Sequence, residues 1–180
     1  PSRMIGNIKS KKTQVDFWTL EEFQRVISLL YKGDYYEHYL FISFWVLFMT
    51  GMRIGEAAAL LWSDIDFDTG LLSITKTMYY KSMDDFKPVE PKTQASVRTI
   101  YVDADTIREL KAWQEVQKKV LKNCGYVLSY NGIPTSKHTL PRALEKLAEL
   151  AGVHRIKIHA LRHSHASLLI SMGENPLLIK

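Results

Sequence analysis

The fold is decided near the end of the chain by the stretch His159-Ala160-Leu161-Arg162-His163-Ser164-His165-Ala166-Ser167-Leu168-Leu169-Ile170. We expect a helix here, in which His159 and Arg162, three positions apart, leave the same face. His163 and Ala166 belong to that face as well. The apolar residues of another face are expected to be buried against the core: Leu161, Leu168 and Met172.

The polar face of this helix has the chemistry of a phosphate site. The guanidinium of Arg162 offers a planar fork of donors to phosphate oxygens. The imidazole of His159 adds a donor whose protonation changes near neutral pH. A basic surface helix with one core histidine fits these residues equally well, so the choice between the two depends on the rest of the chain.

The composition is that of a globular domain with a basic surface. The 180 residues, 46% hydrophobic and 24% charged, are enough for one domain with a substantial core or for a fragment of a longer protein. The chain begins with Pro1 and ends within an apolar helical pattern at residues 176–179, so we expect an excised piece. The net charge of +5 favours a polyanionic partner.

Cysteine usage and hydropathy narrow the setting. The single Cys124 excludes an internal disulfide and a zinc site built on several cysteines, and it fits a reducing compartment. The apolar run of residues 39–49 is too short to span a bilayer, so we expect a buried helix and no membrane partner.

The pattern of apolar residues and turn signals predicts a mixed fold, mainly α with a small antiparallel β-sheet. The expected elements, in chain order, are helices over 19–31 and 35–50, a helix starting near Arg53, a turn over 63–70, strands over 71–79 and 97–102 joined by a long polar loop over 80–96, a helix from Asp103, a short strand over 126–130, a helix ending at Ala151, and the helix quoted above.

Two other polar features could carry chemistry. Arg53 and Glu56 are three apart at the start of a helix, where the acid could hold the guanidinium in one rotamer or form an ordinary structural ion pair. Lys92 lies in the long polar loop, where a single lysine is usually solvated. The aspartates of residues 63–70 lack the glycine and terminal glutamate of an EF-hand, and Ala160 stands where a zinc-binding HExxH helix needs glutamate, so we expect no metal.

Three stretches together resemble the tyrosine recombinase (phage integrase) family. Residues 50–66, which include Thr50-Gly51-Met52-Arg53-Ile54-Gly55-Glu56-Ala57, look like the first conserved box of that family. Residues 91–100 resemble its strand-edge lysine motif, and residues 159–167 resemble its second box. The order of the three stretches and their separations also match the family, and the resemblance extends from about residue 16 to the end of the chain. Within the family, the chain most resembles integrases from Gram-positive phages and integrative elements.

The resemblance implies a fold and an activity. The fold would be the tyrosine recombinase catalytic domain, truncated at its C-terminus. Such enzymes cut one DNA strand when a tyrosine attacks the scissile phosphate, form a 3′-phosphotyrosyl link, and rejoin the strand to a partner. They need no nucleotide cofactor and no metal. The implied partners are double-stranded DNA and other recombinase protomers, as a tetramer on DNA, in the bacterial cytoplasm.

The family pattern also implies residue roles. Arg53 and Arg162 would bind the non-bridging phosphate oxygens, and His159 would support the same phosphate. Lys92 would be the general acid that protonates the departing 5′-oxygen. Glu56 would orient the arginine and the histidine. Three other lysines of the hairpin remain rivals of Lys92: Lys76, Lys81 and Lys87.

The chain departs from the family pattern in two places. All nine tyrosines precede the second box, so the nucleophilic tyrosine and the second His or Trp would lie beyond residue 180. Residues 1–15 would be a basic linker from a missing N-terminal core-binding domain, and residues 16–180 the catalytic domain. We therefore expect this segment alone not to cleave DNA.

Two other functions remain open. A catalytically inactive clamp could use the same cationic cleft to bind DNA. A metal-independent phosphodiesterase with His159 as base would turn DNA over without forming a covalent protein–DNA adduct.

Overall fold

The computed structural model describes residues 16–82, 85–91, 96–136 and 138–175. Its elements are α1 (Leu20–Ile27), α2 (Tyr35–Thr50), α3 (Ile54–Ala58), a 3-10 turn (Trp62–Asp64), β1 (Ile65–Asp66), β2 (Leu71–Ile74), β3 (Thr77–Tyr80), β4 (Phe86–Val89), β5 (Arg98–Tyr101), α4 (Ala104–Val120), α5 (Thr139–Ala151) and α6 (Ala160–Ser171). The predicted class, mainly helical with antiparallel strands, is confirmed.

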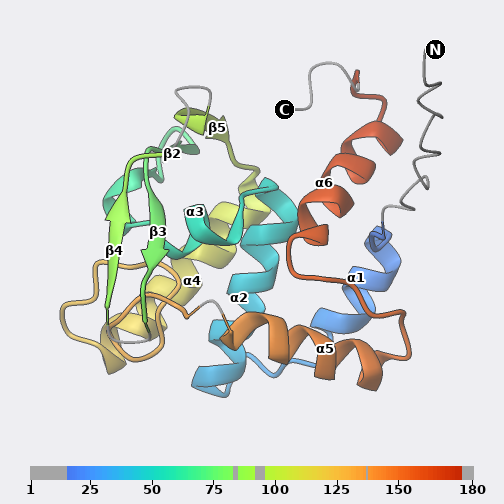
Figure 1. The fold of residues 1–180 in the computed structure, drawn as a ribbon, viewed down its shortest axis with the longest axis horizontal. Helices are drawn as coiled ribbons and strands as arrows, with labels where there is room; N and C mark the ends of the chain where they lie inside the picture. Colours follow the sequence, from blue (N-terminus) through green and yellow to red (C-terminus); the bar gives the residue numbers. More distant parts are fainter. Residues whose placement is uncertain (1–15, 83–84, 92–95, 137, 176–180) are drawn as a thin grey trace, which may run out of the picture.

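Helix α2 is the centre of the molecule. It is apolar around most of its circumference, and it packs against α1, α3, α4, α5 and α6. Figure 1 shows α1, α5 and α6 on one side of it and the strands on the other. The Asp34 side chain accepts from the Glu37 N–H at its start, and Gly51 ends it in the left-handed conformation, with φ of 61°. The expected bounds of this helix are confirmed.

Helix α1 begins as expected and ends early. The side chain of Thr19 and the carboxylate of Glu22 form the predicted capping box. The helix stops at Ile27 instead of continuing to Tyr31: the backbone N–H groups of Leu29 and Leu30 donate only three residues back, to Val26 and Ile27, and the Tyr31 N–H donates to the Glu37 carboxylate at 2.7 Å.

The strands differ most from the expectation. The strand predicted over 71–79 is wrong as one element: β2 joins β1 and β5 in a three-stranded antiparallel sheet, whereas β3 pairs with β4 in a separate two-stranded sheet. The chain leaves the first sheet at Lys76, whose ammonium group binds Asp64 at 2.9 Å. The predicted long loop over 80–96 contains β4, and the predicted turn over 63–70 contains β1. Pro88 fits within β4 because a two-stranded sheet has only edge strands.

Residues 126–130 do not form the predicted strand. Tyr126 makes one isolated bridge to Leu61. Side chains of α4 take backbone carbonyls that a strand partner would otherwise use: Trp113 donates to Val127, and Gln117 donates to Tyr126 and Ser129. The carbonyls are satisfied without a ladder.

Helix α6 packs on the core through its first turns. Leu161 is fully buried, as expected, and Ser164 accepts a hydrogen bond from the backbone N–H of the buried Trp18 at 2.9 Å. Leu168 is only partly buried, and the expected burial of Met172 is wrong: Met172 is 72% exposed, because α6 ends at Ser171. Within the described ranges, no helix has the length and hydrophobicity that crossing a membrane requires.

One buried histidine makes stability depend on pH. His38 in α2 is 4% exposed, lies 5.2 Å from the Trp113 ring, and has no hydrogen-bond partner for either ring nitrogen within the described part of the chain. Burial and then the charge of Lys32 lower the pKa of His38 below 6.5, although Glu109 acts in the opposite direction.

We predict that the free energy of unfolding decreases as the pH is lowered from about 7.5 to about 5, since the unfolded state then binds the proton that the folded state excludes. Replacing His38 by Leu should reduce this dependence in urea titrations across that range. The exposed His138, replaced by Leu, is the matched control and should leave the slope unchanged. An equal pH slope in the His38 variant and the unsubstituted protein would contradict the prediction. Part of the slope should persist, because burial also lowers the pKa of His165.

Candidate functional site

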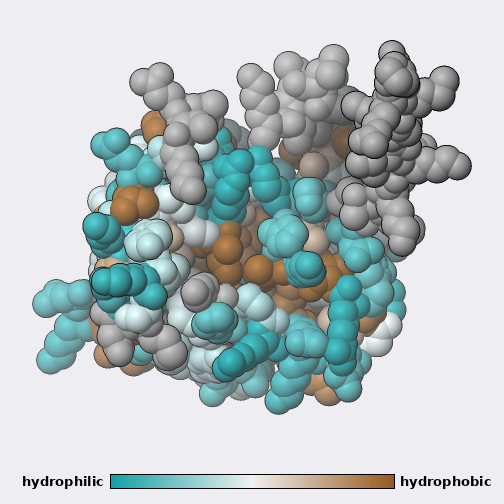
Figure 2. Space-filling view, viewed as in Figure 1, coloured by the Kyte–Doolittle hydropathy of each residue, from teal (hydrophilic) through white to brown (hydrophobic). Residues whose placement is uncertain are grey.

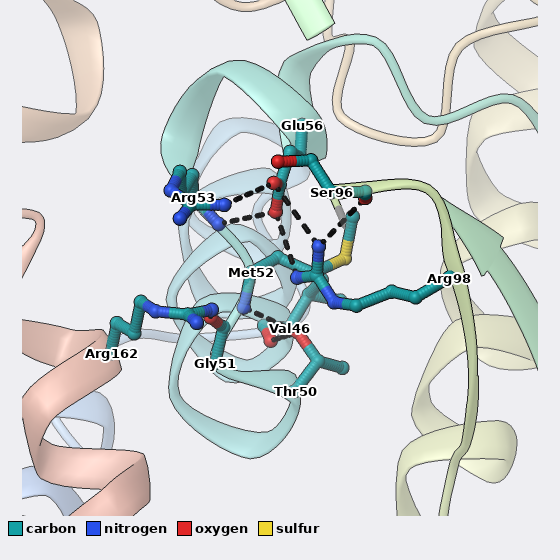
Figure 3. A network of polar contacts seen from close by, with 9 residues as sticks. All are labelled: Val46, Thr50, Gly51, Met52, Arg53, Glu56, Ser96, Arg98 and Arg162. Atoms are coloured by element: carbon teal, nitrogen blue, oxygen red, sulfur yellow. Dashed lines mark hydrogen bonds and ion pairs between the residues drawn. The ribbon is translucent and has the colours of Figure 1, made fainter. Parts of the chain in front are cut away.

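A buried carboxylate organises the polar residues around α3. The side chain of Glu56 is 3% exposed and accepts four hydrogen bonds. Its Oε1 accepts from Nη1 of Arg53 at 2.9 Å and Nη1 of Arg98 at 3.2 Å. Its Oε2 accepts from the backbone N–H of Arg53 at 2.9 Å and Nη2 of Arg98 at 2.9 Å. Figure 3 shows the two arginines reaching this carboxylate from different elements.

These contacts keep Glu56 ionised. Burial alone would raise the pKa of this carboxyl group, but hydrogen bonds from Arg98 and then Arg53 hold the pKa of Glu56 below its ordinary value. One negative and two positive groups therefore share a small volume, and the cluster keeps one net positive charge.

Arg53 lies where the chain enters α3. It occupies the N-cap position, and its backbone N–H donates to Glu56 in the first turn of the helix. The first turn of α3 therefore fixes the positions of both Arg53 and Glu56. The Arg53 side chain is 58% exposed. Within the described residues, Nη1 is the one side-chain nitrogen of Arg53 that donates to a protein acceptor. The other donors of the guanidinium are therefore available to an anion.

Arg162 reaches the same region from α6. Its Nη1 donates to the backbone carbonyl of Gly51, the residue that directly follows α2. Burial, followed by the charges of Arg53 and Arg98, lowers the pKa of Arg162. Arg53 and Arg98 therefore lie close enough to Arg162 to act on it electrostatically, and Figure 3 shows its guanidinium beside the Gly51 turn.

A cavity of about 520 Å³ opens beside these groups. Arg98 and Arg162 line it together with Gly51, and His163 and His165 belong to its wall as well. Figure 2 shows apolar side chains at the middle of this face, where Figure 1 draws α2 and α6, surrounded by hydrophilic ones. The site thus combines cationic groups with an apolar floor.

The predicted residues are gathered in part. Arg53, Glu56 and Arg162 come together around the Gly51 turn. His159 does not line the cavity beside Arg162: it is exposed at the N-cap position of α6, with its ring 6.3 Å from that of His163, and it lines a separate depression together with Lys157.

Lys92 lies outside the described residues. Of its three rivals, Lys76 is paired with Asp64 at 2.9 Å, and Lys81 lies 3.7 Å from Asp85. Lys87 is exposed on β4, opposite Tyr79.

Arg98 is a residue of this site that the sequence did not predict. It donates through two nitrogens to Glu56, yet in the sequence it is one residue of the motif that carries Lys92, and no role was predicted for it. Its spacing from Glu56, 42 residues, gives no local signal. The sole hint was its position in a strand next to that motif. Within the described ranges, no group of three His, Cys, Asp or Glu side chains is placed to hold a metal ion.

The arrangement of the elements is that of tyrosine recombinase catalytic domains. The integrase of transposon Tn1549 in complex with transposon right end DNA superposes with a TM-score of 0.77 at 20% identity, over 96% of this chain and 58% of that one. The XerA recombinase superposes with a TM-score of 0.69 at 18% identity, over 91% of this chain and 53% of that one. At these identities the likeness establishes the fold.

The sequence comparison establishes the family. The phage integrase family model matches residues 17–180, and the chain belongs to that family. The ICEBs1 integrase of Bacillus subtilis (strain 168) is 29% identical over 188 residues, which cover 100% of this chain and 50% of that protein. The integrase of Staphylococcus phage L54a is 29% identical over 135 residues, covering 69% of this chain and 38% of that protein. The chain thus spans about half the length, or less, of these curated relatives.

The Gly51 turn gives a direct test of how the site is held. A Cβ at Gly51 would lie 2.7 Å from Cδ2 of His165, and the residue has a φ of +61°. We predict that Gly51→Ala lowers the free energy of unfolding by about 2–4 kcal/mol, from the left-handed backbone and the overlap together.

Gly152 supplies the matched control, since it ends α5 with a φ of +66° and a Cβ there would meet nothing within 4 Å. Gly152→Ala should cost only about 1–2 kcal/mol, measured by urea denaturation. Adding His165→Ala should make the Gly51 substitution less costly. Equal losses at the two glycines would show that the contact with His165 carries no energy.

Proposed function

We propose that this chain is the catalytic part of a site-specific DNA recombinase that integrates or excises a mobile element. The observation that carries the proposal is the pair formed by Arg53 and Arg162 beside the Gly51 turn, in a chain of the phage integrase family. Each guanidinium is held through one side-chain nitrogen, within the described part of the chain, and keeps other donors. Two such groups suit the two non-bridging oxygens of one phosphodiester.

The proposed reaction is a pair of transesterifications. A tyrosine oxygen attacks the phosphorus, the bond to the 5′-oxygen breaks, and that oxygen takes a proton from a general acid. The products are a 3′-phosphotyrosyl link and a free 5′-hydroxyl. Attack by a 5′-hydroxyl of the partner strand releases the tyrosine and restores a phosphodiester. The energy of the bond is kept throughout, so the reaction requires no nucleotide cofactor.

The arginines would stabilise the charge that grows on the phosphoryl oxygens in the transition state. Because Arg162 is partly buried and bound to a backbone carbonyl, it enters the reaction already oriented. His159 would hydrogen-bond to the same phosphate or transfer a proton there, from its exposed position at the start of α6. The nucleophile would be a tyrosine outside the 180 residues, since all nine tyrosines precede Arg162.

We assign the general acid to Lys92 on the placement of its flanks. On one side of Lys92, Val89 of β4 pairs with Thr77 of β3. The hydroxyl oxygen of Thr77 lies close to Gly55, the residue before Glu56: a Cβ placed on Gly55 would be 2.6 Å from that oxygen. On the other side, the Ser96 carbonyl accepts from Arg98 at 3.1 Å. These described residues on either side of Lys92 support the proposal, because Val89 is linked through Thr77 to α3 and Ser96 through Arg98 to Glu56.

The rival lysines are placed less favourably. Lys76 is occupied by Asp64. Lys87 and Lys81 lie closer to the tip of the β3–β4 hairpin than Val89 does. Lys87 is two residues away from the level of Val89, roughly 7 Å, and Lys81 is about four residues away, roughly 13 Å, at about 3.3 Å per residue.

The proposed partner is double-stranded DNA, with further copies of the full-length protein assembled on it as a tetramer. The net charge of +5 and the cationic cavity support a DNA partner, and the Tn1549 integrase was solved in complex with DNA. The proposed linker to a core-binding domain, residues 1–15, lies outside the described residues. Because the substrate is DNA in a bacterial cell, the proposed location is the cytoplasm.

Trapping the covalent adduct tests the proposal. Full-length protein, mixed with duplex target DNA nicked next to the cleavage site, should form a protein–DNA adduct that survives denaturing electrophoresis. Arg162→Ala should slow adduct formation by about 10²–10³-fold, the loss expected for one donor to a developing oxyanion.

Arg108→Ala is the matched control and should stay within about threefold of the unsubstituted protein, because Arg108 is exposed, pairs with Asp105, and lines neither the cavity beside Arg162 nor the depression beside His159. DNA binding without any adduct would favour the inactive clamp, whereas cleavage without an adduct would favour the phosphodiesterase.

The lysine assignment gives a second test. Lys92→Ala should lower the cleavage rate by about 10²–10⁴-fold, as expected for loss of a general acid. A substrate whose 5′-oxygen is replaced by sulfur should restore the rate, because a thiolate leaves without protonation. Lys87→Ala and Lys76→Ala should stay within about threefold of the unsubstituted protein on either substrate. A sulfur-rescued defect in either of these variants would move the assignment to that lysine.

A further inference from the structure

Glu56 has two arginine partners, and they bind it in different ways. Arg98 donates through both Nη atoms, one to each carboxylate oxygen, in the bidentate geometry that makes the strongest pair. Arg53 donates through one side-chain nitrogen and its backbone N–H. The side chain of Arg98 is 21% exposed and that of Arg53 is 58% exposed. Arg98 is therefore the less exposed counter-ion of Glu56, and Arg53 is the more exposed one.

Arg98 and Arg53 also differ in how many of their guanidinium N–H donors are used within the protein. Nη1 of Arg98 also donates to the Ser96 carbonyl at 3.1 Å, so both of its terminal nitrogens are used within the protein. In the part of the chain that the structure describes, Arg53 uses one terminal nitrogen. Arg98 is thus committed to the fold, whereas Arg53 has donors left for an anion.

The charge balance gives Arg98 a further effect. With Arg98 present, two guanidinium groups face one carboxylate, and a positive charge is left over for a bound phosphate. Without it, the carboxylate of Glu56 would be matched by Arg53 alone, and the pair would be neutral. Hydrogen bonding from Arg98 is also the largest influence that lowers the pKa of Glu56, ahead of either bond from Arg53.

We propose that Arg98 is a positioning residue: by neutralising Glu56 with its two terminal nitrogens, it leaves the charge and the outer donors of Arg53 free for the scissile phosphate. This inference rests on the proposed function. Glu56 has two effects on Arg53: it orients the guanidinium, and it would also cancel the positive charge. Arg98 prevents the loss of charge, while the orienting contact remains.

A double-substitution cycle in the full-length protein tests the inference. The variants are Arg98→Met, Arg98→Lys, Glu56→Gln and the double variant Arg98→Met/Glu56→Gln. Arg98→Met should slow single-turnover adduct formation at saturating DNA by about 10–100-fold, a larger loss than the roughly fivefold decrease in DNA affinity expected for one missing phosphate contact. In the Glu56→Gln background the same change should cost less than about threefold, because no carboxylate is left to neutralise Arg53.

Arg98→Lys should recover at least about fivefold of the loss seen with Met, since it keeps a positive charge but not the planar fork. Arg108→Met is the matched control, because Arg108 is exposed and pairs with Asp105 within α4. Equal losses from Arg98→Met in both backgrounds would mean that Arg98 merely anchors β5, and would overturn the inference. So would a rate equal to that of the unsubstituted protein. If Arg98→Met melts below the assay temperature, the same comparison is made with Arg98→Gln, which removes the charge but keeps a hydrogen-bond donor for Glu56, in both backgrounds.

A readout that does not need cleavage separates this inference from the proposed function. The slope of log affinity for duplex DNA against log salt should fall by about one in Arg98→Met and return in the double variant, because Arg53 is neutralised in the first and free in the second. An unchanged slope in Arg98→Met would count against the inference. Absence of an adduct with the unsubstituted protein would instead count against the proposed function and leave this measurement valid.

Discussion

The site depends on one backbone turn at the C-terminal end of α2. Gly51 takes the left-handed conformation that ends the helix, and this reversal places Arg53 at the start of α3 only two residues later. The carbonyl of Gly51 then faces α6 and accepts from Arg162. A side chain at this position would overlap His165. The turn therefore sets the distance between the two arginines through the backbone, which is far less adaptable than a pair of side chains.

The two arginines are held by different means, and the difference has a physical reason. A carbonyl is neutral, so binding to Gly51 orients Arg162 and leaves its full charge. A carboxylate gives Arg53 a stronger and more directional contact, but it brings a negative charge into a site for an anion. Burying that carboxylate without a second counter-ion would also be costly. Arg98 addresses both problems at once, which explains why a residue from β5 reaches across to α3.

The sequence predicts those parts of the fold that local signals determine. The capping box at Thr19 and the glycine after α2 set helix ends through contacts within a few residues, and both predictions are confirmed. The errors occur where distant partners decide. Residues 71–79 alternate as one strand would, yet Asp64 binds Lys76 and the chain changes sheets there. Residues 126–130 have strand-like residues, but side chains of α4 take their carbonyls.

The same distinction applies to the site. The spacing of Arg53 and Glu56 predicts their ion pair, which the structure confirms, whereas the phosphate role of Arg162 stays a prediction from its motif. The contact of Arg98 could not be predicted, since its partner lies 42 residues away and only the folded sheet brings them together. Such long-range contacts are also the ones that join the separate motifs. A family motif identifies residues that meet a substrate, but the residues that hold those side chains in place belong to the fold and are found by following each buried charge to its partner.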